Sequence, residues 1–222
     1  MGVIKRKGLN RIAKIDYGHL YDWGRSKWPK VVFIVITVFY SLIYIVLRKL
    51  KLFLKREILE KIYLTFIRSL LEYSCEVWDN CSQTDNDRLE TLQLEAARIV
   101  TGLTVYSSRD SLYQETGWEK LSSRRERRKL CLMYNMYHGH APSYLCDLLP
   151  PHVSDVTNYP VRNRNDYTVP RCRLSLYQSS FIPSVINLWN SLDNETRNTR
   201  TYNMHKINLK KKLYFQKFPA IS

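Results

Sequence analysis

The densest group of chemically active side chains is a run of cations at 124–129, with the sequence RRERRK. If this stretch is helical, residues 124 and 128 share one face, and 125 and 129 lie beside them. Phosphate groups would then meet a broad cationic surface. We therefore predict phosphate contacts from Arg124, Arg125, Arg128 and Lys129; the alternative is a charged face that meets only solvent.

A second group of cations follows in a stretch rich in tyrosine. The arginines alternate with aromatic rings at Tyr159, Tyr167 and Tyr177. Arginines beside aromatic rings can clamp phosphates and stack on the bases of single strands, although a plain surface loop has the same composition. The second set of predicted nucleic-acid contacts is therefore Arg162, Arg164, Arg171 and Arg173.

The motifs of common enzymes are absent from the sequence. It has no phosphate-binding loop, no dinucleotide-binding glycine pattern, no nucleophile elbow and no adjacent pair of aspartates. Asp85 and Asp87 stand where a helix is expected to start, and acids are favoured there by the helix dipole. We expect no catalytic activity and no cofactor.

Cysteine and histidine do not form a recognisable metal site. One local group, Cys131, His138, His140 and Cys146, matches no common zinc spacing, so we expect no bound metal. The cysteine count of five is odd, and no Cys-x-x-Cys pair occurs. Reduced cysteines packed as small apolar groups are typical of an intracellular protein, nuclear or cytoplasmic.

The charge is large and unevenly distributed. The formal net charge is +15, which favours polyanionic partners: RNA, DNA or an anionic membrane surface. The balance is +6 in residues 1–47, −1 in 48–118 and +10 in 119–222. The middle of the chain therefore resembles a charge-balanced core, and both ends are expected to face the polyanion.

The most apolar stretch, residues 31–47, contains 17 residues without a charge. A membrane-spanning helix needs about 20 apolar residues, with about 17 as the lower limit. A buried helix or a strand rich in β-branched residues is the default interpretation of this composition. A single-pass protein with a basic cytoplasmic domain is therefore the rival to a nucleic-acid-binding protein.

Hydrophobic spacing predicts an all-α fold, with a short strand pair within 155–178 and an apolar helix near the N-terminus. Helices are expected at 56–73, from a cap at Thr84 or Asp85 to Thr101, from a cap at Ser108 to Thr116, at 122–137 and from 181 onward. Gly102 should end the second of these helices. Trp78, Trp118 and Trp189 are expected to anchor the core, because large aromatic side chains at such positions usually pack.

Four pieces of sequence occur in a familiar order and spacing: LEYSCEVWDNCS at 71–82, LETLQLEAARIVTGL at 89–103, APSYLCDLLPP at 141–151 and FIPSVINLWNSLD at 181–193. Together with residues 47–70, they resemble the C-terminal end of reverse transcriptases from non-LTR, LINE- or jockey-like retrotransposons. The resemblance covers about residues 47–213 and leaves residues 1–46 unmatched.

The resemblance implies a division of the chain and a function. Residues 1–47 would be a basic arm with the apolar segment, 48–105 thumb-like helices, and 106–222 a basic helical region after the thumb. The catalytic palm, with its paired aspartates, and the endonuclease domain of such reverse transcriptases have no counterpart here. The implied function is at most template or primer contact by a truncated polymerase. A structural domain that binds acidic proteins is a third interpretation of the basic faces.

Overall fold

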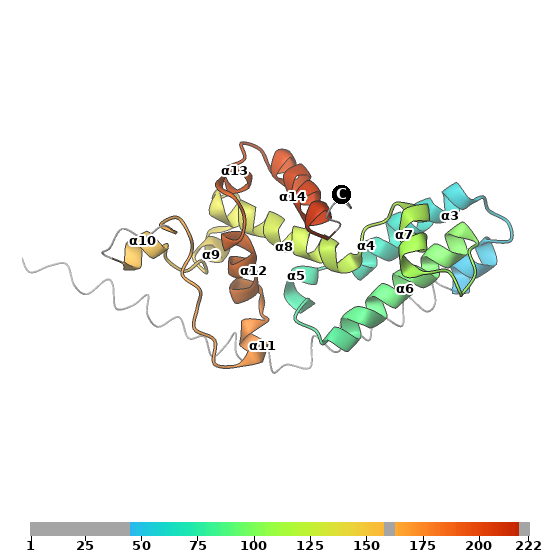
Figure 1. The fold of residues 1–222 in the computed structure, drawn as a ribbon, viewed down its shortest axis with the longest axis horizontal. Coiled ribbons are helices and arrows are strands. Elements are labelled where there is room, and N and C mark those ends of the chain that lie inside the picture. Colours follow the sequence, from blue (N-terminus) through green and yellow to red (C-terminus); the bar gives the residue numbers. More distant parts are fainter. Residues whose placement is uncertain (1–44, 158–162, 218–222) are drawn as a thin grey trace, which may run out of the picture.

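A computed structural model describes residues 45–157 and 163–217, and this part of the chain is built from helices (Figure 1). The predicted all-α fold is confirmed. A short helix at 45–50 comes first. The other elements are α3 (Arg56–Ile62), the π-helix η2 (Tyr63–Ile67), α4 (Arg68–Leu71), α5 (Cys75–Trp78), α6 (Gln83–Thr101), α7 (Arg109–Thr116), α8 (Leu121–Tyr137), α9 (Ser143–Cys146), α10 (Val153–Val156), α11 (Ser175–Gln178), α12 (Phe181–Asn190), α13 (Asn194–Arg197) and α14 (Tyr202–Lys217).

Local capping interactions define the ends of α6 and α7. The side chains of Ser82 and Ser108 accept hydrogen bonds from backbone N–H groups in the first turn of each helix. Gly102 and Gly117 end the two helices with φ of +78° and +67°, a backbone conformation that glycine adopts without steric cost. The predicted end at Gly102 and the Ser108 cap are therefore confirmed, whereas Ser82, and not Thr84 or Asp85, caps α6.

The buried apolar side chains form two cores. The first core surrounds Tyr63, Leu89 and Trp118, where α3 and α7 each pack against α6 and where η2 and α4 continue from α3. The Tyr63 and Trp118 rings stack with centroids 4.3 Å apart. The second core surrounds Tyr134 and Trp189, where α12 and α14 pack against the second half of α8. The predicted burial of Trp78, Trp118 and Trp189 is confirmed.

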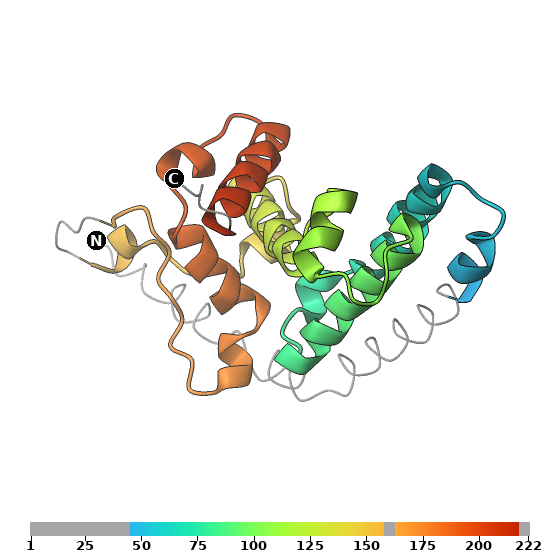
Figure 2. The ribbon, with the colours of Figure 1, turned by 45° about the vertical axis from the view of Figure 1, so that its right-hand side comes forward.

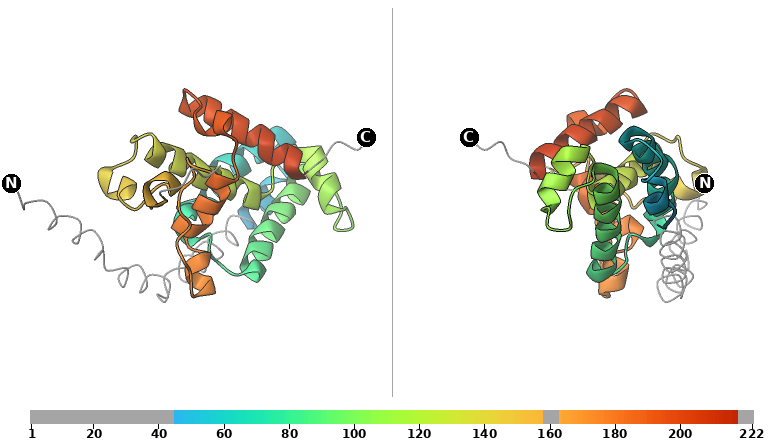
Figure 3. Two further views of the ribbon diagram at one scale, coloured as in Figure 1. Left: turned by 60° about the vertical axis from the view of Figure 1, so that its left-hand side comes forward. Right: turned by 90° about the vertical axis from the view of Figure 1, so that its right-hand side faces the viewer.

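Helix α8 belongs to both cores and connects them. Leu121 at its start is buried in the first core, and Leu130 and Tyr134 near its end are buried in the second. Figure 2 shows the two groups of helices on either side of α8, and α14 lies against α8 (Figure 3). Trp118, three residues before α8, also packs in the first core. The change from one core to the other therefore takes place within α8.

The expected strand pair within 155–178 is not formed in the described part of that stretch. Its described residues contain α10 and α11, and the extended contact is one isolated antiparallel bridge between His152 and Tyr167. Alternating burial does not continue past Tyr167, because Val169, two positions further on, is exposed and not buried. One buried side chain gives a strand pair too little packing to persist.

The apolar segment predicted at 31–47 falls mainly outside the described residues, which begin at 45. Leu47 lies in the helix at 45–50 and is buried in the first core. None of the helices in the described part combines the length and the apolar character that a membrane crossing requires.

Candidate nucleic-acid interface

Most cations of the α8 run pair with acids that lie in or directly after α4 and α5. Arg125 is 2% exposed; its Nε donates to Asp79 Oδ1 at 2.6 Å and its Nη2 to Asn86 Oδ1 at 2.6 Å. Its guanidinium also lies over the Trp78 ring, 5.6 Å from the centroid. Lys129 places Nζ 2.6 Å from Asp79 Oδ2. A single carboxylate therefore holds two buried cations.

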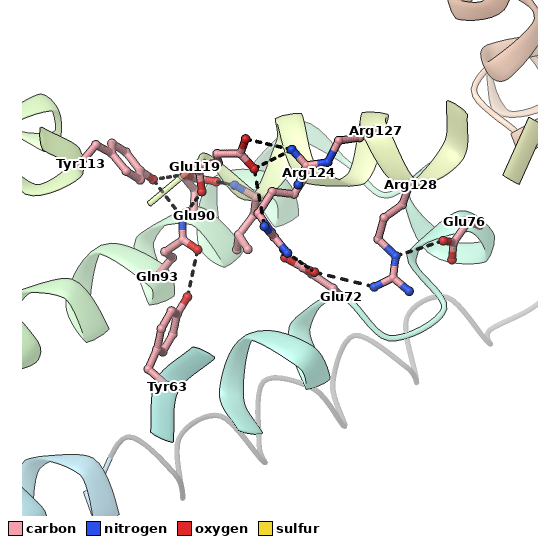
Figure 4. A network of polar contacts seen from close by, with 11 residues as sticks. Tyr63, Glu72, Glu76, Glu90, Gln93, Tyr113, Glu119, Arg124, Arg127 and Arg128 are labelled. Carbon is pink, nitrogen blue, oxygen red and sulfur yellow. Dashed lines mark hydrogen bonds and ion pairs between the residues drawn. The ribbon is translucent and has the colours of Figure 1, made fainter. Parts of the chain in front are cut away.

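The remaining cations of the run are paired in the same way (Figure 4). Arg124 binds Glu72 through Nε and Nη2, and Arg127 donates from Nη1 to both oxygens of Glu119 at 2.7 and 2.8 Å. Although burial by itself would lower it, the pKa of Arg124 is raised by the hydrogen bond and the charge of Glu72. Arg128, the most exposed of the run, still donates from Nε to a glutamate, 3.2 Å away.

These contacts make an α8 ionic cluster that is almost neutral. It joins five cations to four carboxylates: Arg124, Arg125, Arg127, Arg128 and Lys129 with Glu72, Glu76, Asp79 and Glu119. The expectation of a broad cationic face on α8 is therefore wrong, because the cations are used to pack α8 against its neighbours. Breaking such buried pairs lowers the stability of the fold, so the main role of the cluster is to hold α8 against its neighbours.

The second predicted set is placed differently. Arg164, Arg171 and Arg173 are exposed and take part in no ion pair within the described residues, whereas Arg162 lies outside them. We call Arg164, Arg171 and Arg173 the loop arginines. The aromatic part of the prediction is not supported at Tyr167, which is buried and stacks on His152 with centroids 4.2 Å apart.

Arg164 also lines a polar cavity of about 280 Å³ between its loop and the turn from α12 to α13. Arg197 forms part of the wall, where Nη1 donates to Asp166 Oδ1 at 2.7 Å and Nη2 to Asn190 O at 2.6 Å. Amide side chains supply most of the other polar groups of the lining: Asn163, Asn165, Asn190 and Asn194.

The sequence analysis missed cations on α14 and in the preceding turn. Arg200, Lys206 and Lys210 are exposed and form no ion pair in the part of the chain that the structure describes. The positive balance of residues 119–222 pointed to this region, but the compact run at 124–129 drew the assignment to α8.

Cysteine and metal chemistry find no support in the described residues. No group of three or more His, Cys, Asp or Glu side chains there is arranged to hold a metal ion. Burial raises the pKa of the Cys75 thiol to about 12 and that of Cys81 to about 11, so both remain protonated and unreactive at neutral pH.

Comparison with known protein families, curated proteins and solved structures finds no match to this chain. The resemblance to non-LTR reverse transcriptases therefore rests on the sequence pieces at 71–82, 89–103, 141–151 and 181–193 and remains a prediction.

Proposed function

We propose that this chain binds single-stranded RNA or DNA without sequence preference, through phosphate contacts made by its C-terminal half. In this proposal it is a thumb and post-thumb module of the non-LTR reverse transcriptase type that does not polymerise. The palm aspartates on which polymerisation depends in that family have no counterpart in the sequence.

The observation that carries the proposal is where the uncompensated charge lies. Residues 119–222 have a balance of +10, and the cations of α8 within that region pair with Glu119 and with three acids from before residue 119. In the described residues of this region, the cations that are exposed and without ion pairs are Lys120, Arg164, Arg171, Arg173, Arg200, Lys206 and Lys210. Such a surface attracts a phosphate backbone whatever its sequence.

Titration of the full chain with labelled single-stranded RNA and DNA across a salt series tests the proposal. Each phosphate neutralised on a single strand contributes about 0.7 to the slope of log K against log salt. If the loop arginines each contact one phosphate, their combined replacement by alanine lowers the slope by about 2.

A matched control removes three exposed cations that lie on the surface around the first core. In this variant, Lys49, Lys55 and Lys61 are replaced by alanine together. Both triple variants change the net charge equally. A larger loss of slope in the loop variant supports an interface at the loop arginines. Equal losses would reduce the interaction to net charge, and absence of binding at low salt would overturn the proposed function.

A further inference from the structure

A second cavity, of about 180 Å³ and lined by residues with polar side chains, lies where α8 begins, and we call it the α8 cavity. This volume is more than ten times the roughly 10–15 Å³ that one water molecule needs. Side chains from the first half of α6, from α7 and from the start of α8 line it: Gln83, Asn86, Asp87, Glu90, Arg109, Tyr113, Lys120, Ser122 and Arg125.

Arg125 supplies the buried donor of this cavity. Its side chain is 2% exposed, and two of its three nitrogens are held by Asp79 and Asn86. Nη1 has no hydrogen-bond partner among the described residues. Because Asp79 and Asn86 fix the plane of the guanidinium, Nη1 is a preoriented donor on a side chain that lines the cavity.

The start of α8 adds further donors. The helix has 17 residues, and its first-turn N–H groups carry the positive end of the helix dipole. The hydroxyl and amide of Ser122 have no partner in the described part of the chain. Lys120 and Arg109 are exposed at the rim and likewise form no ion pair there.

The two acids of the cavity are already engaged. Glu90 accepts the Tyr113 hydroxyl at Oε1 and the Leu121 N–H at Oε2, 3.1 Å away (Figure 4). Burial and the charge of Glu90 raise the pKa of Tyr113, so the phenol keeps its proton and continues to donate. Asp87 accepts a hydrogen bond from Gln83. The Leu121 N–H is therefore taken, whereas the Ser122 and Arg125 donors remain available to a ligand.

We infer that the α8 cavity binds a phosphate group, held by Arg125 Nη1, by the Ser122 hydroxyl and amide, and by Lys120 and Arg109 at the rim. The formal charge of the lining is +1, because Arg109, Lys120 and Arg125 face Asp87 and Glu90. A tetrahedral oxyanion accepts hydrogen bonds from several directions, as this arrangement of donors requires. The phosphate is either a free ion or part of a nucleic-acid backbone.

Thermal unfolding of the full chain with inorganic phosphate, against sodium chloride of equal ionic strength, tests this site. We expect phosphate to raise Tm, and the increase to disappear when Lys120 and Arg109 are both replaced by alanine. Replacing Lys49 and Lys61, which are exposed on the helices of the first core, by alanine removes the same charge elsewhere and should leave the increase intact. No phosphate-specific increase, or an equal loss in both variants, would overturn the inference.

A competition experiment separates the two sources of phosphate. A single-stranded oligonucleotide assigns the site to the backbone if it suppresses the phosphate-dependent increase in Tm of the wild type and by itself raises the Tm of the wild type more than that of the rim variant. An increase that persists in its presence assigns the site to free phosphate. Neither result depends on the loop arginines, so this inference can stand or fall separately from the proposed function.

Discussion

Replacing Asp79 by alanine should destabilise the fold strongly, because this one carboxylate neutralises two buried cations. Arg125 Nε and Lys129 Nζ each lie 2.6 Å from its oxygens, and the two cationic side chains are 2% and 10% exposed. Without the carboxylate, both charges remain in a site that water reaches poorly. The arginine would retain only Asn86 and the Trp78 ring as partners.

Removing one partner of a buried pair costs about 3–5 kcal/mol. A domain of ordinary stability unfolds at a cost of about 5–15 kcal/mol, so the change is a large fraction of the whole. With a urea slope of about 2 kcal/mol per molar, the unfolding midpoint should fall by about 2 M.

Urea unfolding followed by tryptophan fluorescence measures this shift, since Trp78 lies beside the cluster and reports on its environment. Asp147→Ala is the control, because this acid is exposed and has no ion pair in the described residues. Its effect should stay within about 0.5 kcal/mol. Asp79→Asn, which keeps the shape and removes the charge, should fall between the two.

If Asp79→Ala unfolds at the same urea concentration as the control, the reasoning is refuted. The cations of α8 would then not depend on this carboxylate, and α8 would again become a candidate phosphate-binding face. A double-mutant cycle between Asp79 and Arg125 makes the test quantitative, with an expected coupling of about 1–3 kcal/mol.

Three further substitutions test other parts of the fold. Gly102→Ala should cost about 1–2 kcal/mol in urea unfolding, because φ is +78° while the nearest atom to a new Cβ is 3.9 Å away, so the cost is backbone strain and not a clash. Gln93→Leu should lower the free energy of unfolding by about 1–3 kcal/mol, because Gln93 accepts a hydrogen bond from the Tyr63 hydroxyl and donates one to the Glu119 carbonyl, both at 2.9 Å. A loss below about 0.5 kcal/mol would contradict a stabilising role for these two hydrogen bonds. Burial lowers the pKa of His205, so the unfolded chain binds the proton first as the pH falls below the ordinary histidine value of about 6.5. Stability should therefore decrease below that pH, and His205→Gln should show a weaker decrease in the same urea titrations.

Interactions within a few residues made much of the helical fold predictable. The Ser108 cap and the glycine at 102 each act on the backbone within four positions, so their patterns are readable without knowledge of the tertiary structure. The sequence was a weaker guide where several neighbouring polar side chains could cap the same helix. At the start of α6 the cap is Ser82, and not Thr84 or Asp85. Apolar spacing similarly indicated that Trp118 and Trp189 would be buried.

Long-range contacts decided the site. The cations at 124–129 have one acid, Glu126, among them and therefore predict an open basic face. Their partners are far away in sequence: Arg124 pairs with Glu72 across 52 positions, and Arg125 with Asp79 across 46. Electrostatic neutralisation depends on distance in space, so no local pattern could reveal that α8 uses its charge to hold the fold together.

The sequence by itself determined the helical class, several helix ends and the excess of positive charge, because these follow from short-range backbone geometry and from composition. Only the tertiary structure decided which cations are used internally and which remain available. It buried Arg125 with Asp79 and left Arg171 and Arg173 exposed, since burial and pairing depend on how distant helices pack.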